Sequence, residues 1–255
     1  MCEWLAARHQ RRDARVVAVN GPQGVGKSTL CATAVDTLAA LGVRAVTVSI
    51  DDFYLTHDAQ RAVAARHPGN RYLEFRGYPG THDVALGAAV LDALRGDAGH
   101  GVRVPVYDKS AHGGRGDRAP EAQWRTCVGP FDLVLVEGWM LGFTPAPEAT
   151  LPDAALAPAN AALRAYDAWN VRCDAMVHLV MADPTSVIRW RVDAERARRH
   201  AGAPGLTDDE ARDYVMRFVP AYEAWVPGLR EGGGVRGPRL TLTLGDDRLP
   251  VAREG

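Results

Sequence analysis

Residues 21–28 carry the pattern G-x-x-x-x-G-K-[ST] in full, as Gly21-Pro-Gln-Gly-Val-Gly-Lys-Ser28. Its glycines allow a tight turn that directs successive backbone N–H groups at phosphate oxygens. The Lys27 ammonium can reach the β- and γ-phosphates of a nucleotide, and the Ser28 hydroxyl can bind Mg²⁺. The pattern therefore predicts a nucleotide-binding P-loop. Its expected members are Gly21, Gln23, Gly24, Val25, Gly26, Lys27, Ser28 and Thr29.

The sequence on either side of this loop predicts the elements that position it. Val16–Asn20 is a short apolar run, as expected of a buried parallel strand. A helix is expected after the loop, because apolar residues recur at helical spacing until Gly42, a plausible stop. This context favours a nucleotide loop over a chance glycine-rich turn. The helix would begin under the phosphates, where its dipole favours anions.

Further apolar runs alternate with helical patterns, which predicts an α/β fold with a mostly parallel sheet and helices on both faces. The 255 residues, 47% of them hydrophobic, can form one domain over residues 1–255. The expected later strands are Ala45–Ile50, Asp132–Val136, Met176–Met181 and Leu240–Leu244. The expected later helices are Val84–Leu94, Asn160–Trp169, one beginning at Asp183-Pro184, and one from the Thr207–Glu210 capping box to about Trp225.

Acidic residues stand where two of these strands end. Asp51 and Asp52 follow the second strand, and Glu137 closes the third. Ligands of open parallel sheets bind at the carboxyl ends of the strands. Phosphoryl transfer needs charge neutralisation and a group that orients or deprotonates the nucleophile. Since Asp51 and Asp52 alternate in direction on a strand, one of them is expected to face the phosphates; the alternative is that they simply begin a loop.

Two long polar segments, residues 55–82 and 107–120, interrupt the alternation. Both are rich in glycine or proline and are expected to lie outside the core as functional excursions. The sequence has no Asn-Lys-x-Asp guanine signature and no Asp-x-x-Gly after the third strand. Among P-loop proteins, the kinase branch therefore fits better than the GTPases.

Longer motifs resemble the plant- and fungal-type D-glycerate 3-kinase family, within the superfamily of uridine kinase, phosphoribulokinase and pantothenate kinase. The resemblance extends from about residue 16 to 245. The motifs that carry it include Ser49–Thr56 (SIDDFYLT), Leu73–Gly77 (LEFRG), Tyr107–Ser110 (YDKS), Gly114–Arg118 (GRGDR) and Glu137–Phe143 (EGWMLGF).

The resemblance implies roles for the residues at the phosphates. Asp51 matches the general base that accepts the proton of the acceptor hydroxyl. Glu137 matches the acidic residue that closes the Walker B strand and organises Mg²⁺ with Ser28, and Lys27 completes the catalytic set. Arg189 and Arg191 match the start of a lid, residues 185–215, that closes over the nucleotide and excludes water.

The resemblance also implies an acceptor site in the two excursions. Tyr107, His112 and Asp83 fall where uridine kinase-like enzymes contact the acceptor. Glycerate carries a carboxylate, so a matching pocket needs a cation, and Arg76, Lys109, Arg115 and Arg118 are candidates. His82 and His112 are either substrate contacts or loop-packing residues. The expected acceptor set is Asp52, Tyr54, Arg76, His82, Asp83, Tyr107, Lys109, His112, Arg115 and Arg118.

One loop departs from the family pattern. Residues 78–81 read Tyr-Pro-Gly-Thr, where the family usually has Asn-Ala-Gly-Ser. If this loop lines the acceptor pocket, the bulkier Tyr78 and the rigid Pro79 bear on substrate choice.

The expected function is an ATP- and Mg²⁺-dependent kinase that phosphorylates D-glycerate to 3-phosphoglycerate. One alternative is a kinase of the same superfamily for another small acceptor, a nucleoside or a pantothenate-like alcohol. A second is a regulatory NTP-binding module. Asp51 argues against the second, because a switch has no acceptor hydroxyl to deprotonate.

Composition sets the remaining expectations. The net charge of −1 and the pI near 6.7 give no bulk attraction to nucleic acid or to an anionic membrane, so the arginines of 189–199 are expected on a lid helix and a solvated face. No apolar stretch approaches the ~20 residues that span a bilayer. Met1–Arg15 lacks the apolar core of a signal peptide, and four scattered cysteines suit a reducing, cytoplasmic setting. The oligomeric state is left open.

Overall fold

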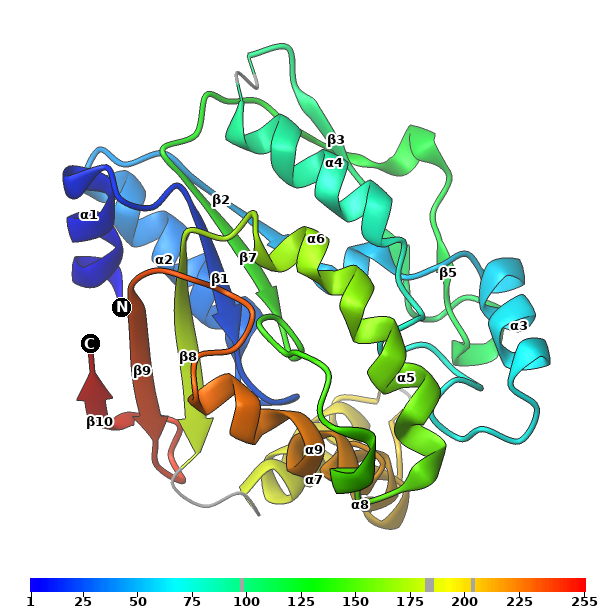
Figure 1. Cartoon of the computed structure of the whole chain (residues 1–255). Helices are drawn as coiled ribbons and strands as arrows, with labels where there is room; N and C mark the ends of the chain where they lie inside the picture. Colours follow the sequence, from blue (N-terminus) through cyan, green and yellow to red (C-terminus); the bar gives the residue numbers. More distant parts are fainter. Residues whose placement is uncertain (97–98, 182–185, 203–204) are drawn as a thin grey trace.

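The computed structural model describes residues 1–96, 99–181, 186–202 and 205–255 (Figure 1). Its centre is a sheet with the strand order β10-β9-β8-β1-β7-β2, in which every neighbouring pair is parallel except β10 with β9. The mostly parallel sheet is therefore confirmed. Its strands are β1 (Val16–Asn20), β2 (Ala45–Ser49), β7 (Leu133–Gly138), β8 (Ala175–Met181), β9 (Arg239–Leu244) and β10 (Pro250–Glu254).

Helices cover both faces of this sheet, as predicted (Figure 1). Successive strand residues point to opposite faces, and because helices lie on both sides, both sets of side chains are buried. Val17 and Val19 pack with α1 (Cys2–Arg11) and α2 (Lys27–Ala40). Val16 and Ala18 share the other core with α4 (Val84–Arg95), α6 (Asp167–Asn170) and α9 (Val219–Arg230).

The long predicted helix from Thr207 to Trp225 is wrong in one respect, because it is two helices. The Thr207–Glu210 capping box is present and opens α8 (Asp208–Met216). The chain then breaks and restarts as α9, whose second residue is Pro220. Proline lacks an N–H, and its ring would clash with the carbonyl four residues earlier in a continuous helix, so the break falls just before it.

Other differences are smaller. The helix expected over Asn160–Trp169 is interrupted, with α5 (Ala157–Ala162) joined to α6 through a 3₁₀ turn. α1 and β10 had no counterpart among the predicted elements. Asp183-Pro184, the expected start of α7 (Ser186–His200), lies outside the described residues, as does residue 185 of the expected lid.

Residues 55–82 do not lie wholly outside the core, contrary to the prediction. They contain α3 (His57–Arg66), and the side chains of Tyr72, Leu73 and Tyr78 are buried in the same core as α4 and α9. Tyr72 and Leu73 are adjacent, and Tyr78 follows only after residues 74–77, so the three do not form a regular helical or strand pattern. The excursion is therefore a packed layer over the carboxyl edge of the sheet.

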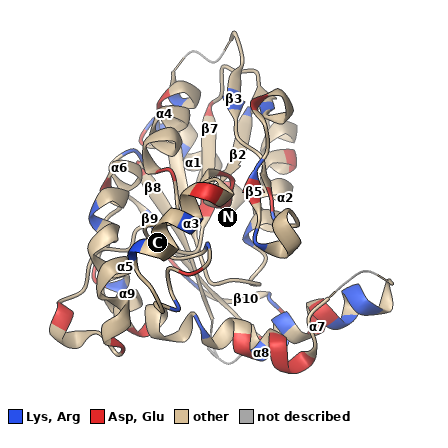
Figure 2. Cartoon of the chain, turned by 90° about the vertical axis from the view of Figure 1, so that its right-hand side faces the viewer, with Lys and Arg blue, Asp and Glu red and all other residues tan. Residues whose placement is uncertain are grey.

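The second excursion contains the short antiparallel pair β4 (Tyr107–Asp108) with β5 (Asp117–Arg118). A second such pair, β3 (Val102–Val104) with β6 (Arg125–Cys127), flanks it. α7 and α8 pack against each other and form a charged projection at the lower right of Figure 2. In the described part of the chain, none of the helices combines the length and apolar character needed to cross a membrane. The 3₁₀ turns are Ile50–Phe53, His112–Gly114, Glu121–Gln123, Glu148–Thr150, Ala154–Leu156 and Leu163–Tyr166.

Candidate active site

The P-loop lies between β1 and α2, as predicted. Gly24 and Gly26 have φ angles of 79° and 94°, which residues other than glycine rarely adopt. The Lys27 ammonium folds back along the loop and donates to the carbonyls of Gly21 and Pro22 at 2.9 and 3.0 Å. Burial lowers the pKa of Lys27, although Glu137 and Asp51 oppose the shift. The loop thus holds a cation whose present partners are neutral carbonyls, which a phosphate can displace.

The Ser28 hydroxyl and the Glu137 carboxylate meet where the loop approaches β7. The Ser28 hydroxyl donates to Glu137 Oε1 at 2.7 Å, and the Glu137 side chain is buried at the end of its strand. The register of β1 with β7 sets Val19 beside Glu137, so the acidic residue is fixed next to the loop. Hydroxyl and carboxylate oxygens are hard ligands of the kind that Mg²⁺ prefers. The donors present therefore fit this ion.

Two polar contacts fix the rest of the loop. Gln23 N–H donates to the Tyr222 hydroxyl at 3.3 Å, and that hydroxyl also hydrogen-bonds the Gln23 side chain. The Asn20 amide donates to the carbonyls of Trp139 and Leu141 at 2.9 and 2.8 Å. Val25 is buried under the loop, whereas Thr29 is exposed. The P-loop is therefore anchored to α9 and to the segment that follows β7.

Asp51 lies across from the loop, in the 3₁₀ turn that follows β2. The Lys109 ammonium donates to Asp51 Oδ2 at 2.6 Å, and the Tyr54 hydroxyl is also hydrogen-bonded to Asp51. Burial acts to raise the pKa of Asp51, but Lys109, His82 and Lys27 together bring this pKa below its usual value. Asp51 is therefore a carboxylate at neutral pH.

Asp52 faces elsewhere, since the two carboxylates lie in a 3₁₀ turn and not on a strand. This corrects the prediction of strand alternation, although the outcome is the same: of the pair, Asp51 lines the cavity described next. Burial raises the pKa of Asp52 to about 6, against the attraction of Arg125.

A cavity of about 250 Å³ opens beside the P-loop, between the two excursions and the α8–α9 junction. Asp51, the predicted base, lines it, as do three residues of the predicted acceptor set: Tyr54, Arg76 and Lys109. Gln23 lines it from the P-loop side. Lining residues outside the predicted site are Arg71, Tyr72, Phe75, Gly77, Gly114, Trp139, Tyr214, Arg217 and Phe218, together with Tyr78 of the loop that departs from the family pattern.

Tyr78, the residue that departs from the family pattern, is part of this wall. Its ring stacks on Phe218 with centroids 5.3 Å apart and meets Trp139 edge-on at 5.7 Å. Its hydroxyl donates to the carbonyl of Arg217. The departure therefore links the first excursion to the end of α8, and the buried aromatic ring forms one side of the cavity.

Arg76 and Arg118 are held by the protein itself. Arg76 donates to the carbonyls of Gly114, Arg115 and Lys109 and lies over the Tyr107 ring. Arg118 donates to Asp83 at 3.2 Å and to the carbonyl of Tyr54 at 2.9 Å. The two guanidinium groups therefore shape the loops around the cavity.

His82, Asp83 and Tyr107 lie behind the cavity wall. The buried His82 ring stacks on Tyr54 at 4.3 Å, and its Nδ1 is 2.8 Å from the Tyr166 hydroxyl. Burial lowers the pKa of His82 to about 3, so the ring is neutral. Asp83 caps α4, and Tyr107 packs edge-on against Tyr54. These residues support the ones that line the cavity.

His112 and Arg115 lie on the outer side of the second excursion. The exposed His112 ring stacks on His57 at 3.8 Å and its Nε2 is 3.1 Å from Asp117. Arg115 lies over the Phe75 ring at 4.8 Å. Neither residue lines the cavity beside Asp51.

Arg189 and Arg191, the arginines predicted to begin a lid, are engaged with acidic partners. Arg189 pairs with Asp246 at 2.6 Å, and Arg191 pairs with Glu195 at 2.7 Å. Arg191 also lies over Tyr214, a cavity residue of α8. In this conformation, α7 is therefore connected to the cavity through α8.

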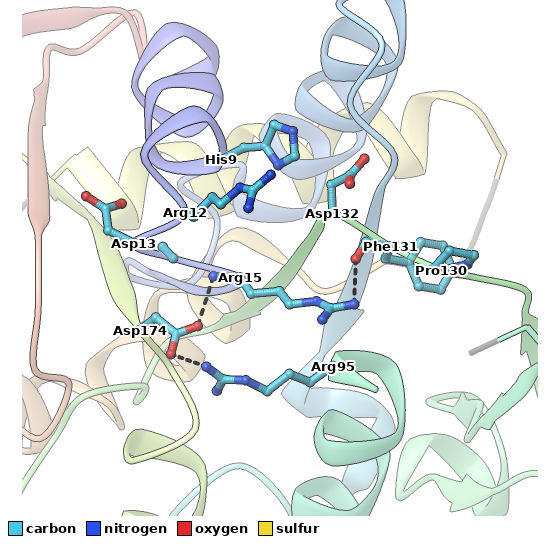
Figure 3. A pocket seen from close by; sticks show the side chains of 10 residues that line it. His9, Arg12, Asp13, Arg15, Arg95, Pro130, Phe131, Asp132 and Asp174 are labelled. Carbon is cyan, nitrogen blue, oxygen red and sulfur yellow. Dashed lines mark hydrogen bonds and ion pairs between the residues drawn. The ribbon is translucent and has the colours of Figure 1, made fainter. Parts of the chain in front are cut away.

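A larger cavity, about 390 Å³, lies at the opposite edge of the sheet (Figure 3). Its residues precede β1, β7 and β8, at the amino ends of the strands. Asp174 accepts from the backbone N–H groups of Arg15 and Val16, both at 2.9 Å, and pairs with Arg95. These charges hold the chain together, so volume alone does not mark the functional site.

Comparison with known proteins gives the same assignment as the fold. No protein-family model matches the chain. D-glycerate 3-kinase, chloroplastic, of Arabidopsis thaliana is 40% identical over 244 residues, which cover 92% of this chain and 54% of that protein. The chain thus spans about half the length of this plant relative. The probable ATP-dependent kinase TDA10 of Saccharomyces cerevisiae is 32% identical over 243 residues, covering 89% of this chain and 83% of that one.

A solved structure, D-glycerate 3-kinase from Cryptococcus neoformans var. grubii, superposes with a TM-score of 0.88 at 31% identity, covering 100% of this chain and 96% of that one. The parallel sheet, the P-loop after β1 and the acidic residues that follow β2 and lie at the end of β7 define a P-loop kinase fold. Within that class, the chain belongs to the D-glycerate 3-kinase family.

Proposed function

We propose that this protein is an ATP- and Mg²⁺-dependent kinase that phosphorylates D-glycerate at its primary hydroxyl, giving 3-phosphoglycerate. The observation that carries the proposal is the position of Asp51. This carboxylate lines a small cavity that also reaches the P-loop at Gln23. An acceptor in the cavity would therefore meet the nucleotide at an ionised base.

The reaction follows from this arrangement. The acceptor oxygen attacks the γ-phosphorus while its proton passes to a carboxylate oxygen of Asp51. The bond from that phosphorus to the β,γ-bridging oxygen breaks, and ADP leaves with the electron pair. Lys27 would move from the loop carbonyls to the phosphates and compensate the charge of the transferred group. Each step uses a residue that already lies at the carboxyl edge.

Ser28 and Glu137 would hold Mg²⁺, since their oxygens are already 2.7 Å apart beside the loop. A bound Mg²⁺ neutralises phosphate charge in kinases of this fold class. The named relatives support ATP as the donor, because one is called an ATP-dependent kinase. Lid closure by α7 and α8, the excursions as acceptor-binding segments, and a single domain over residues 1–255 belong to this proposal.

The cavity favours a small anionic acceptor. Its volume of about 250 Å³ is below the roughly 300–1,000 Å³ typical of pockets for drug-sized ligands. Its wall carries the cations Arg71, Arg76, Lys109 and Arg217 around a single acidic side chain, Asp51. A three-carbon acid fits this size and charge better than a nucleoside does, and the two solved or named D-glycerate 3-kinases support the choice.

The cysteines bear on the cellular setting. All four cysteines are free, and Cys31, Cys127 and Cys173 are buried. Reduced, scattered cysteines are typical of the cytoplasm, where we place the protein, with small molecules and not nucleic acid or membrane as its partners.

Product identification tests the proposal. Purified protein would be incubated with ATP, Mg²⁺ and D-glycerate, and the phosphorylated product identified by ³¹P NMR. We expect the 3-phosphate as the product. Formation of the 2-phosphate would refute the assigned hydroxyl, and transfer to uridine or pantothenate but not to D-glycerate would favour another kinase of the superfamily. Nucleotide hydrolysis that no acceptor stimulates would favour the regulatory module.

A further inference from the structure

The contact between Lys109 and Asp51 has a consequence for how the site is controlled. Lys109 follows β4 in the second excursion, and Asp51 follows β2, so the 2.6 Å ion pair joins separate segments across the cavity. One carboxylate oxygen of the proposed base therefore accepts a hydrogen bond from a lysine. A carboxylate so held is a weaker base, because the cation stabilises its charged form.

This ion pair is built so that its partners can exchange. The side chains of Lys109 and Asp51 are 59% and 31% exposed, so both can reach a ligand in the cavity. The backbone that carries Lys109 is fixed, because Asp108 accepts from the N–H and hydroxyl of Ser110 and Arg76 donates to the Lys109 carbonyl. The Lys109 side chain can therefore change partner while its backbone stays in place.

The three arginines of the cavity wall, by contrast with Lys109, have partners that a ligand would not need to displace. Arg76 is bound to backbone carbonyls. Arg71 pairs with Asp153 and the Tyr72 hydroxyl, and Arg217 pairs with Asp213. Among the cations that line the described cavity, Lys109 is the one whose ion-pair partner is the proposed base.

We propose that Lys109 is a gating residue that pairs with Asp51 while the acceptor site is empty and with the acceptor carboxylate once it is filled. The inference rests on the proposed function and extends it to regulation and substrate class. An acidic acceptor takes the ammonium group and frees the lone pair of Asp51 for the hydroxyl proton. Water and neutral alcohols leave the ion pair intact.

The gate explains how one contact serves two purposes. With the site empty, water can approach the γ-phosphorus, but the base that would accept its proton is weakened by Lys109, so ATP hydrolysis is slow. With an acid bound, the transferred proton goes from the acceptor hydroxyl to Asp51, and the phosphoryl group goes to the acceptor oxygen. Specificity for acids then arises from releasing the base as well as from binding the charge.

The test compares Lys109→Met and Lys109→Arg with the unaltered chain, and Arg66→Met serves as the control. Arg66 is an exposed cation at the end of α3, outside the cavity. ADP formation would be measured with ATP and Mg²⁺ alone, then with D-glycerate and with glycerol, which lacks the carboxylate.

We expect Lys109→Met to raise ATP hydrolysis without acceptor by about 10-fold, since it frees a general base worth roughly 10²–10⁴-fold. The KM for D-glycerate should rise about 10–100-fold, the loss of one charge-assisted hydrogen bond, while use of glycerol does not fall. Lys109→Arg, which keeps the charge, should keep hydrolysis low. In an Asp51→Asn background, Lys109→Met should not raise ATP hydrolysis.

The outcomes separate the two proposals. Unchanged or lower hydrolysis in Lys109→Met overturns the gate even if the KM for D-glycerate rises, because Lys109 would then only bind the acceptor. The same is true if Arg66→Met raises hydrolysis as much. If no variant phosphorylates D-glycerate but Lys109→Met still raises hydrolysis, the gate is supported and the proposed acceptor is wrong.

Discussion

The two ends of the central sheet both carry a charged cavity, yet they use their charges differently. At the amino end, Asp174 accepts from two strand N–H groups, and Asp132 accepts from the N–H of Arg44 at 2.8 Å. At the carboxyl end, Asp51 and Glu137 are bound by the side chains of Lys109 and Ser28. The amino-end carboxylates hold backbone N–H groups at the strand starts, whereas the carboxyl-end carboxylates are held by side chains that a ligand can displace.

This difference assigns stability to one end and chemistry to the other. The larger cavity, about 390 Å³, has carboxylates that are committed to fixing the strand starts (Figure 3). The smaller one, about 250 Å³, has one carboxylate, Asp51, whose partner is a side chain that a ligand can displace. Substitutions at the two ends should therefore separate activity from folding stability.

The largest effect is expected at Asp51. Asp51→Asn removes the base and keeps the size of the side chain, so kcat should fall about 10²–10⁴-fold. ATP affinity should change little, since the P-loop contacts remain. Steady-state kinetics with an ATP-binding titration would measure both quantities. Near-normal turnover would exclude Asp51 as the base.

Lys27→Ala should have the second largest effect on activity. The substitution removes the ammonium group that the loop carbonyls now hold, so the transferred phosphoryl group loses this cation. We expect a loss of about 10²–10³-fold in kcat together with a higher KM for ATP, because the cation acts on both bound and reacting phosphates. Unchanged kinetics would contradict the assignment of residues 21–28 as the nucleotide site.

At the amino end, Asp174→Ala should affect stability and not kcat. It removes a carboxylate that is 21% exposed and leaves two strand N–H groups and Arg95 without their acceptor. We expect the free energy of unfolding in urea to fall by about 2–4 kcal/mol. The matched control is Asp92→Ala, whose carboxylate is 55% exposed in its pair with Arg172 and should be worth under about 1 kcal/mol. Equal losses in both variants would remove the distinction.

The smallest effect is a pH-dependent one at Asp52. Its pKa is raised by burial to about 6, so the folded state holds a proton that the unfolded state releases between about pH 4 and 6. Stability should therefore decline as the pH rises through this window. Asp52→Asn should gain about 1–2 kcal/mol at pH 7 and nothing below pH 4. Urea unfolding at pH 4 and 7 measures this, and a gain that is independent of pH would contradict it.

The features predicted well from the sequence are those written in consecutive residues. The P-loop, the strand before it and the carboxylates after β2 and β7 are each local, and parallel strands bring their carboxyl ends together in any fold of this class. Burial of both faces of the sheet follows from the continuous apolar runs. These elements required no knowledge of which distant segments meet.

The wall of the cavity beside Asp51 could not be predicted in the same way. Arg217 and Phe218 reach the cavity from the α8–α9 junction, where the predicted helix continued through the break that Pro220 indicates. Tyr72 and Tyr78 lie in a segment that looks polar on average. The four candidate cations were equivalent in sequence, and contacts alone separate Lys109 from the three arginines.

The most direct test of the central claim is acceptor-dependent ADP formation by the purified protein. The acceptors would be D-glycerate, L-glycerate, glycerol, uridine and pantothenate at equal concentration, each with ATP and Mg²⁺. We predict strong stimulation by D-glycerate and little by the neutral or larger acceptors. Stimulation by uridine or pantothenate with none by D-glycerate would contradict a small, acid-selective cavity beside Asp51.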